Sequence, residues 1–248
     1  MPPAADFVDL WVRAGSDGLK NGADPVCQQI FMILLLKASD PSGPQFNVKT
    51  TSPAKPQPEF KELGLRHVPA LVHKGDTIEQ QDDIIEYIDE KFAKPSLQYF
   101  DPDADDATID LFSKFCFFIK EVNKDPKAME LELRKIDEFL KDMDTVFLTG
   151  PQLTHLDCRI LPVLHHIRVA TEALKGYRIP NHLRHLWRFM KRAYDCDPFR
   201  KTCPADQEIV LYWADRGDTP NLTPAKRAEM TRQAPKFSLL LPEGVEEV

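Results

Sequence analysis

The spacing of apolar residues changes once along this chain, and that change constrains its fold more than any other feature. Up to about residue 92, short alternating apolar runs are interleaved with apolar helical runs. Beyond residue 105 the apolar residues recur at intervals of three and four, the period of a helix that buries one face. A chain of 248 residues can hold two domains of about 100 to 150 residues each. We therefore expect a mixed domain followed by an all-helical one.

The first part of the chain predicts the element order β, α, β, α, β, β, α, which is that of a thioredoxin-like domain. Asp24 is a good N-cap for the first helix, and Pro25 suits its first position, because proline lacks only an N–H that would be unpaired there. Pro69 opens the third strand, where a proline interrupts no ladder. Strands are expected at 7–13, 45–51, 68–73 and 77–80, and helices at 25–38, 58–65 and 82–92.

A stretch with prolines and turn-favouring residues separates the two modules. In the tail that follows them we expect a helical turn or two after Thr223 and Pro224, docking of residues 237–241, and fraying of the rest. The assigned ranges are 1–93 for the thioredoxin-like domain, 94–105 for the linker, 106–217 for the helical domain and 218–248 for the proline-rich, partly ordered tail. The stripes expected in the helical core are Ile109, Phe112, Cys116 and Ile119; Met129, Leu133, Ile136, Leu140, Met143 and Phe147; and Leu183, Leu186, Trp187, Met190 and Tyr194.

Charge and composition exclude several classes of function. The formal charge is −7 with both signs interleaved, so no basic stripe is available for a phosphate backbone, and nucleic acid is a poor partner. The longest apolar run, 30–36, is far shorter than the roughly 20 residues of a membrane-spanning helix. No N-terminal stretch resembles a secretory signal, and five scattered cysteines fit reduced thiols. We expect a cytoplasmic protein.

Three motifs occur in an order that resembles one family. They are Ala14-Gly15-Ser16-Asp17-Gly18 after the first strand, Asp24-Pro25-Val26-Cys27 at the first helix, and Cys203-Pro204-Ala205-Asp206 near the last helix. Over residues 5–215 the chain resembles the invertebrate branch of the chloride intracellular channel family, within the glutathione-transferase superfamily. The resemblance implies an α+β thioredoxin-like N-terminal domain plus an all-α C-terminal domain, the two-domain glutathione-transferase-like fold.

A second landmark of that superfamily is a capping box at Thr154 and Asp157. The Thr154 hydroxyl is expected to accept a hydrogen bond from the N–H of Asp157, while the Asp157 carboxylate accepts from the N–H of Thr154. Capping boxes occur in many proteins, so this one marks the fold and is not a catalytic site.

Thiol chemistry is the first functional question raised by the resemblance. Family members that resemble glutaredoxins have a cysteine at the first position of the second motif, where the helix N-terminus favours a thiolate. In this chain Asp24 occupies that position, as in invertebrate members. A carboxylate forms no mixed disulfide, so the sequence disfavours an enzymatic function. Cys27 is either a reactive thiol in the first helical turn or a buried small hydrophobe, and the buried interpretation is favoured.

A glutathione-like site is implied at four positions. By resemblance, the main chain of Val68 before a cis Pro69 pairs with a peptide, and Gln80 and Gln81 stand where transferases hold the γ-glutamyl group. The alternative is a strand-opening proline followed by polar turn residues. Glutathione binding without turnover is thus a hypothesis, and no other cofactor is expected.

Histidines offer little support for a metal site. His165, His166, His182 and His185 fall on expected helices, with no carboxylate completing a motif such as H-E-x-x-H. We expect no metal site here, and assign these residues to caps, surface or core.

The segment 26–38 has two interpretations. By resemblance, the first helix and the next strand form the membrane-inserting region, with Val26, Phe31, Leu34, Leu35 and Lys37 as candidates. Alternatively, Phe31, Leu34 and Leu35 form the core face of an ordinary helix, being spaced i, i+3 and i+4. Insertion would bring the charge of Lys37 into or near the bilayer, at about 2.5–3.5 kcal/mol if it lay centrally.

Three functions follow from these observations. The first is a chloride channel-like protein that is soluble in the cytoplasm and associates with intracellular or plasma membranes, with chloride and those membranes as partners and a homo-oligomer in the membrane. The second is a non-catalytic scaffold or glutathione-binding protein. The third is a glutathione-dependent transferase or oxidoreductase, which Asp24 disfavours. We adopt the first.

Overall fold

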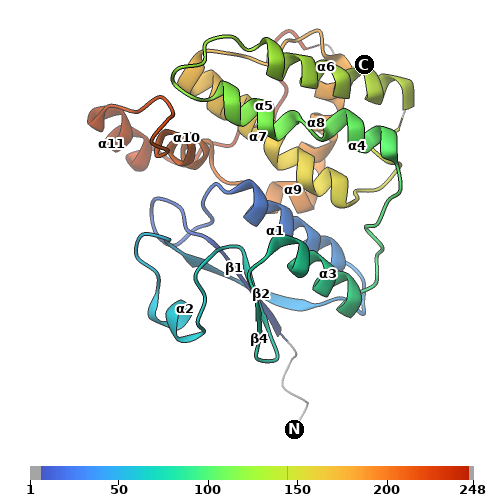
Figure 1. Ribbon diagram of the computed structural model, residues 1–248, viewed down its shortest axis with the longest axis vertical. Coiled ribbons are helices and arrows are strands. Elements are labelled where there is room, and N and C mark those ends of the chain that lie inside the picture. Colours follow the sequence, from blue (N-terminus) through green and yellow to red (C-terminus); the bar gives the residue numbers. More distant parts are fainter. Residues whose placement is uncertain (1–6, 144, 246–248) are drawn as a thin grey trace. The chain divides into compact units, whose positions relative to one another are not determined.

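The structure is a computed structural model that describes residues 7–143 and 145–245, and the chain forms two compact units, 1–97 and 98–248 (Figure 1). The boundary between the units falls inside the range expected for the linker. The last four residues of that range, 102–105, already belong to a helix, because Asp101 caps it and Pro102 occupies its first turn.

The first unit is a thioredoxin-like domain with the element order predicted from the sequence. Its sheet has the strand order β2-β1-β3-β4; β1 pairs with β2 in parallel, and β3 pairs with both β1 and β4 in antiparallel fashion. The elements are β1 (Phe7–Arg13), α1 (Pro25–Lys37), β2 (Gln45–Thr51), α2 (Pro58–Glu62), β3 (Ala70–His73), β4 (Asp76–Ile78) and α3 (Gln81–Lys91).

Both faces of this sheet are covered, because the side chains of the central strand β1 alternate between two apolar environments. Val8, Leu10 and Val12 are buried on one face, where α1 and α3 lie side by side (Figure 1). Trp11 points to the other face and meets Phe60 of α2 edge-to-face, with ring centroids 5.3 Å apart.

The hairpin between β3 and β4 turns at Lys74 and Gly75, as predicted. Both residues have positive φ, 54° and 93°, which a two-residue hairpin turn requires. The strand predicted at 77–80 is shorter than expected and ends at Ile78. It ends there because the Glu79 carboxylate accepts two main-chain N–H groups from a neighbouring loop, and Gln80 caps α3.

The second unit is all-helical. Most residues of α7 are buried, and α7 packs against α8 and α10, while α6 packs against α4, α5 and α8 (Figure 1). The helices are α4 (Pro102–Thr108), α5 (Leu111–Phe118), α6 (Lys127–Met143), α7 (His155–Lys175), α8 (Arg184–Asp195), α9 (Asp197–Thr202), α10 (Asp206–Ala214) and α11 (Pro224–Arg232).

Two of the three apolar stripes predicted for this core are largely buried, apart from Met143, which is 45% exposed, and in the third stripe Ile119 alone is buried as predicted. Met129 through Leu140 and Leu183 through Tyr194 present their stripe residues to the core. Ile109 and Phe112, by contrast, are 69% and 41% exposed. Most positions between residues 109 and 119 are apolar, and the segment is divided between two helices. The three-and-four spacing could therefore be assigned to more than one helix face. The buried residues are Leu111, Phe115, Phe118 and Ile119.

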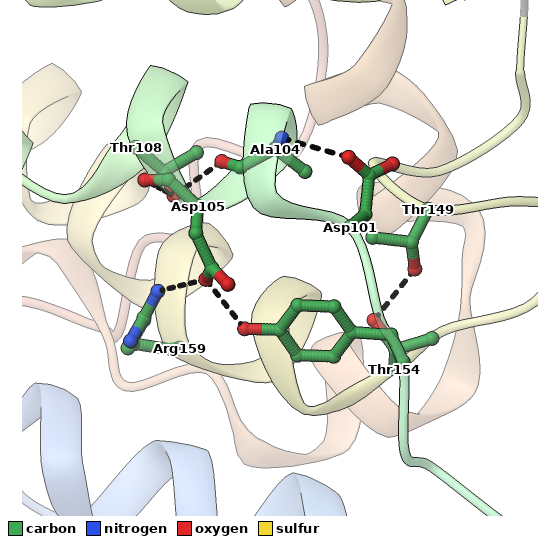
Figure 2. A network of polar contacts seen from close by, with 8 residues as sticks. Asp101, Ala104, Asp105, Thr108, Thr149, Thr154 and Arg159 are labelled. Atoms are coloured by element: carbon green, nitrogen blue, oxygen red, sulfur yellow. Dashed lines mark hydrogen bonds and ion pairs between the residues drawn. The ribbon is translucent and has the colours of Figure 1, made fainter.

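Carboxylates organise the start of the second unit (Figure 2). Asp101 accepts from the N–H of Ala104 at 3.0 Å, and Asp105 accepts from Tyr99 and Arg159 at 2.7 and 3.4 Å. Arg159 belongs to α7, so this network holds α4 against the beginning of the central helix.

The capping box of α7 forms as the sequence predicts. Asp157 accepts from the N–H and the hydroxyl of Thr154, both at 2.8 Å, and its second oxygen accepts from the N–H of Leu148 at 3.0 Å. Burial raises the pKa of Asp157 against the opposing effect of these hydrogen bonds. The carboxylate therefore accepts three hydrogen bonds from two residues while excluded from water, and the cap is a structural device.

The tail is more ordered than expected over the residues that the structure describes. Helix α11 begins after Thr223 and Pro224, as predicted, but runs for nine residues. The segment expected to fray, apart from 237–241, instead forms main-chain contacts with the helical unit at Ala234, Lys236 and Glu243.

Candidate functional site

The N-terminus of α1 is occupied by a carboxylate. Asp24 has extended backbone, and one of its carboxylate oxygens accepts from the N–H groups of Val26 and Cys27 at 3.0 and 2.9 Å. Pro25 follows in the first helical position. The two N–H groups that would stabilise a thiolate in a redox-active member of this fold are therefore already satisfied by Asp24.

Cys27 lies in the first turn of α1 and is buried. Burial raises its pKa well above the usual range, and the nearby charge of Asp24 raises it further. A protonated thiol without access to solvent is a poor nucleophile, so this geometry disfavours disulfide exchange at Cys27. Reactivity itself is a question for alkylation of the native protein.

The four positions of the glutathione-like site fall on two neighbouring segments. Val68 and Pro69 precede β3, and the peptide bond between them is cis. Gln80 and Gln81 begin α3. Glu79, which the sequence did not single out, joins the two segments, because its carboxylate accepts from the N–H groups of Arg66 and His67, both at 2.6 Å.

The two glutamines differ in what they can offer a ligand. Gln80 is exposed at the N-terminus of α3. The amide of Gln81 donates to the side chain of Gln29 on α1 at 2.9 Å, so it links two helices. Neither Gln29 nor Glu79 carries a sequence signal that would have marked it in advance, because each acts through a partner far along the chain.

The C-terminal end of α1 is held by a buried ion pair. Lys37 is 1% exposed, and its ammonium lies 2.6 Å from the carboxylate of Asp89 on α3, whose side chain is 16% exposed. The sequence marked Lys37 as an obstacle to membrane insertion and gave no sign of its partner. In the folded domain this lysine fastens α1 to α3.

The remaining membrane-segment candidates are buried to different degrees. Leu34 is fully buried, whereas Val26, Phe31 and Leu35 are half-buried. The core face predicted from Phe31, Leu34 and Leu35 is therefore wrong in its phase. The innermost residues are Ile30, Met32, Ile33 and Leu34, and three of them, Ile30, Ile33 and Leu34, have the same i, i+3, i+4 spacing one residue earlier. Phe31 lies at the edge of this core and packs against Phe46 of β2, with ring centroids 6.0 Å apart.

In the described parts of the chain, none of the helices combines the length and the apolar character that crossing a bilayer requires. Across residues 7–143 and 145–245, the structure also gathers no group of three metal-ligating side chains.

His165 and His166 are core residues of α7. His165 Nδ1 lies 3.0 Å from the Tyr194 hydroxyl, and Trp213 Nε1 donates to His166 Nδ1 at 3.0 Å. Because an indole N–H can only donate, His166 carries its proton on Nε2. Burial lowers the pKa of His166 to about 3, assisted by the charge of Arg216, and burial lowers that of His165 as well. Both imidazoles are neutral at physiological pH.

Comparison with known proteins places these features in a family. A family model for the CLIC-like N-terminal domain matches residues 6–95. The chain is 40% identical over 233 residues to chloride intracellular channel exl-1 of Caenorhabditis elegans, covering 92% of this chain and 97% of that protein. The chain belongs to the chloride intracellular channel family. Within that family, this chain has an aspartate, Asp24, as the N-cap of its first helix.

Solved structures agree with this assignment. The crystal structure of the chloride intracellular channel homologue EXC-4 from C. elegans matches with a TM-score of 0.84 at 27% identity, covering 98% of this chain and 96% of that one. Chlamydomonas reinhardtii dehydroascorbate reductase matches with a TM-score of 0.73 at 18% identity, covering 83% of this chain and 96% of that chain. The Leishmania glutathione transferase TDR1 matches with a TM-score of 0.66 at 15% identity, covering 83% of this chain and 46% of that one. The last two likenesses concern the fold alone, and they confirm the glutathione-transferase-like arrangement of elements predicted for this chain.

We predict that Asp24→Cys creates a redox site that the natural chain lacks. A thiol at this N-cap would gain the two N–H groups now satisfied by Asp24, which would lower its pKa and promote exchange with oxidised glutathione. Peptide mass mapping should detect a glutathionyl adduct at position 24. Asp24→Ser is the matched control, because it keeps a capping oxygen without a thiol. Absence of an adduct at position 24 in a folded Asp24→Cys protein would contradict the prediction.

We also predict that the buried histidines, His165 and His166, make this chain less stable at acidic pH. A histidine with a depressed folded-state pKa binds its proton mainly in the unfolded chain, so stability is present above about pH 6.5 and falls as the pH drops. From pH 7.5 to 5, His166 alone should lower the free energy of unfolding by about 2 kcal/mol.

His166→Gln should remove this contribution, since glutamine can accept from Trp213 and does not titrate. The measurement is urea unfolding at both pH values. The exposed His182→Gln variant should keep the pH dependence of the natural chain. An unchanged pH dependence in His166→Gln would show that the acid sensitivity comes from elsewhere.

Proposed function

We propose that this protein forms a chloride-conducting pore after leaving a water-soluble fold for intracellular membranes. The observation that carries the proposal is the 40% identity to a chloride intracellular channel over nearly the whole of both chains. The departure at Asp24 supports a conducting function over glutathione-dependent catalysis, because it removes the thiol that such catalysis would use.

The membrane step of the proposal requires α1 to leave its domain. Helix α1 has 13 residues, which at 1.5 Å per residue is about 20 Å, while the hydrocarbon core of a bilayer is about 30 Å thick. The segment that inserts therefore includes residues after α1, and several copies would assemble around the conduction path. The α1 residues that would face lipid are the half-buried Val26, Phe31 and Leu35, together with Leu34 after its release from the core.

Release of α1 requires breaking the Lys37–Asp89 pair. An ion pair with one fully buried partner is costly to break, because separation leaves a charge without its counter-ion in an apolar setting. We propose that this pair is a main contributor to the barrier between the two forms.

On the cofactor side, we propose that glutathione binds without forming a covalent bond, through the main chain of Val68 and the exposed Gln80 at the start of α3.

The test of conduction is chloride efflux from liposomes treated with the full chain at pH 7 and about pH 5.5. We expect efflux and co-flotation, and expect both to be lost in Phe31→Ser/Leu35→Ser, which makes two half-buried α1 positions polar. The matched control is Phe117→Ser/Leu131→Ser, at two exposed positions of the helical unit. Lack of efflux from the natural chain at both pH values, or equal loss in the two variants, would reject the proposal.

Lys37→Met should destabilise the soluble form and favour the membrane form. We expect a loss of about 2–3 kcal/mol in the free energy of unfolding, below the 3–5 kcal/mol of fully buried pairs because Asp89 retains some contact with water. Flotation at pH 7 should rise in parallel. In Lys37→Met/Asp89→Leu both charges are absent, so most of the stability should return. A Lys37→Met protein as stable as the natural chain would show that the pair does not fasten α1.

A further inference from the structure

The tail crosses the helical unit as an extended strap, residues 234–240. The side-chain amide of Gln207 donates to the carbonyl of Ala234 at 2.8 Å, and its oxygen accepts from the N–H of Lys236 at 3.0 Å. The carbonyl of Lys236 accepts from the main-chain N–H of Asp206 at 2.8 Å. Gln207 and Asp206 thus engage three successive polar groups along one edge of the strap.

The contacts continue with the same spacing toward the C-terminus. The N–H and hydroxyl of Ser238 both donate to the Asp206 carboxylate, at 3.0 and 2.7 Å. The guanidinium of Arg168 donates to the carbonyls of Ser238 and Leu240, at 2.8 and 2.6 Å. These seven hydrogen bonds involve only residues 234, 236, 238 and 240 of the strap. Alternate residues of the strap are therefore bound, by three side chains and by one main-chain N–H at the start of α10.

The groups that hold the strap are positioned independently of it. Asp206 and Gln207 open α10 and are each less than 10% exposed. The Arg168 guanidinium lies over the rings of Trp187 and Tyr194, at 5.3 Å from each centroid. Removal of the strap would take hydrogen-bond partners from a carboxylate, an amide and a guanidinium together. Asp206, Gln207 and Arg168 therefore form a surface suited to the main chain of an extended segment.

The strap itself contributes little apolar contact. Phe237 and Leu240 are 48% and 77% exposed, and among the large apolar residues of the strap Leu239 alone is half-buried. Between the strap and the helices lies a cavity of about 630 Å³, lined by Ile179, Trp187, Val210 and Met230 among others. The groove is therefore larger than the segment that occupies it.

We propose that this groove is a binding site for an extended segment of a partner protein, occupied in cis by residues 234–240. The partner segment needs main-chain N–H groups at the positions equivalent to Lys236 and Ser238, so proline is excluded at both. At the position of Ser238 it also needs a serine or threonine, whose hydroxyl donates to the Asp206 carboxylate. Proline is tolerated at the position of Pro235. An apolar side chain reaching the cavity would give the partner an advantage over the strap. The cis segment competes at high effective concentration, so the site is closed until the strap is displaced.

The test uses the full chain and a fluorescent peptide of residues 233–241, followed by fluorescence anisotropy. Ser238→Pro removes an N–H and a hydroxyl that hold the strap, so the peptide should bind this chain at least ten-fold more tightly than the natural one. Phe237→Pro is the matched control, because none of the seven strap contacts uses the N–H at that position, and it should behave as the natural chain does. A peptide with proline in place of its serine should not bind.

Two further measurements make the outcome decisive. Hydrogen exchange should show the amides of Lys236 and Ser238 protected in the natural chain and that of Lys236 exposed in Ser238→Pro. Adding Gln207→Ala to Ser238→Pro should weaken peptide binding at least ten-fold. Absence of saturable binding to a folded Ser238→Pro chain whose strap has opened, or binding indifferent to Gln207→Ala, would overturn the proposal. Neither result depends on chloride conduction.

Discussion

The first helix is fixed at both ends by carboxylates, and the thioredoxin-like domain depends on that arrangement. Asp24 satisfies two N–H groups at the N-terminus of α1, and Asp89 neutralises the buried Lys37 at its C-terminus. Between these ends, Ile30, Ile33 and Leu34 fill the core against β1. The same helix N-terminus that could activate a thiol in this fold is here a structural cap. An acid at that position caps the helix and, unlike a cysteine, forms no mixed disulfide.

The two ends of α1 differ in the free energy that is needed to release them. Removal of the Asp24 cap would expose N–H groups that water can satisfy, a cost of about 1 kcal/mol. Separation of Lys37 from Asp89 leaves a charge in an apolar setting, which costs more. A transition that frees α1 is therefore controlled mainly at its C-terminal end. The buried histidines of the helical unit add a separate dependence on pH, because their neutral state is required by their burial and by the donor at Trp213.

What the sequence could predict was local or periodic, and what it missed depends on contacts between distant residues. The element order, the cap at Asp24 and the box at Thr154 and Asp157 each follow from residue types within a few positions. The partner of Lys37 lies 52 residues away on another helix, and no local pattern could identify it. Glu79 and Gln29 were missed for the same reason.

The errors in phase have a related origin. Around Phe112 and within α1, apolar residues occupy nearly every position, so three-and-four spacing can be drawn on more than one face. Which face is buried is then decided by neighbouring elements.

The tail shows a further limit of composition as a guide. Its prolines and polar residues indicated fraying outside residues 237–241, because such a segment buries too little apolar surface to hold itself in place. The strap is nonetheless ordered from residue 234 on, since its order comes from Asp206, Gln207 and Arg168, groups that belong to the folded unit. Hydrogen bonds to main-chain atoms place few demands on side chains, so they leave no recognisable pattern in the strap itself. A groove that binds a segment mainly through its main chain can accept other segments as well, and that makes the tail replaceable.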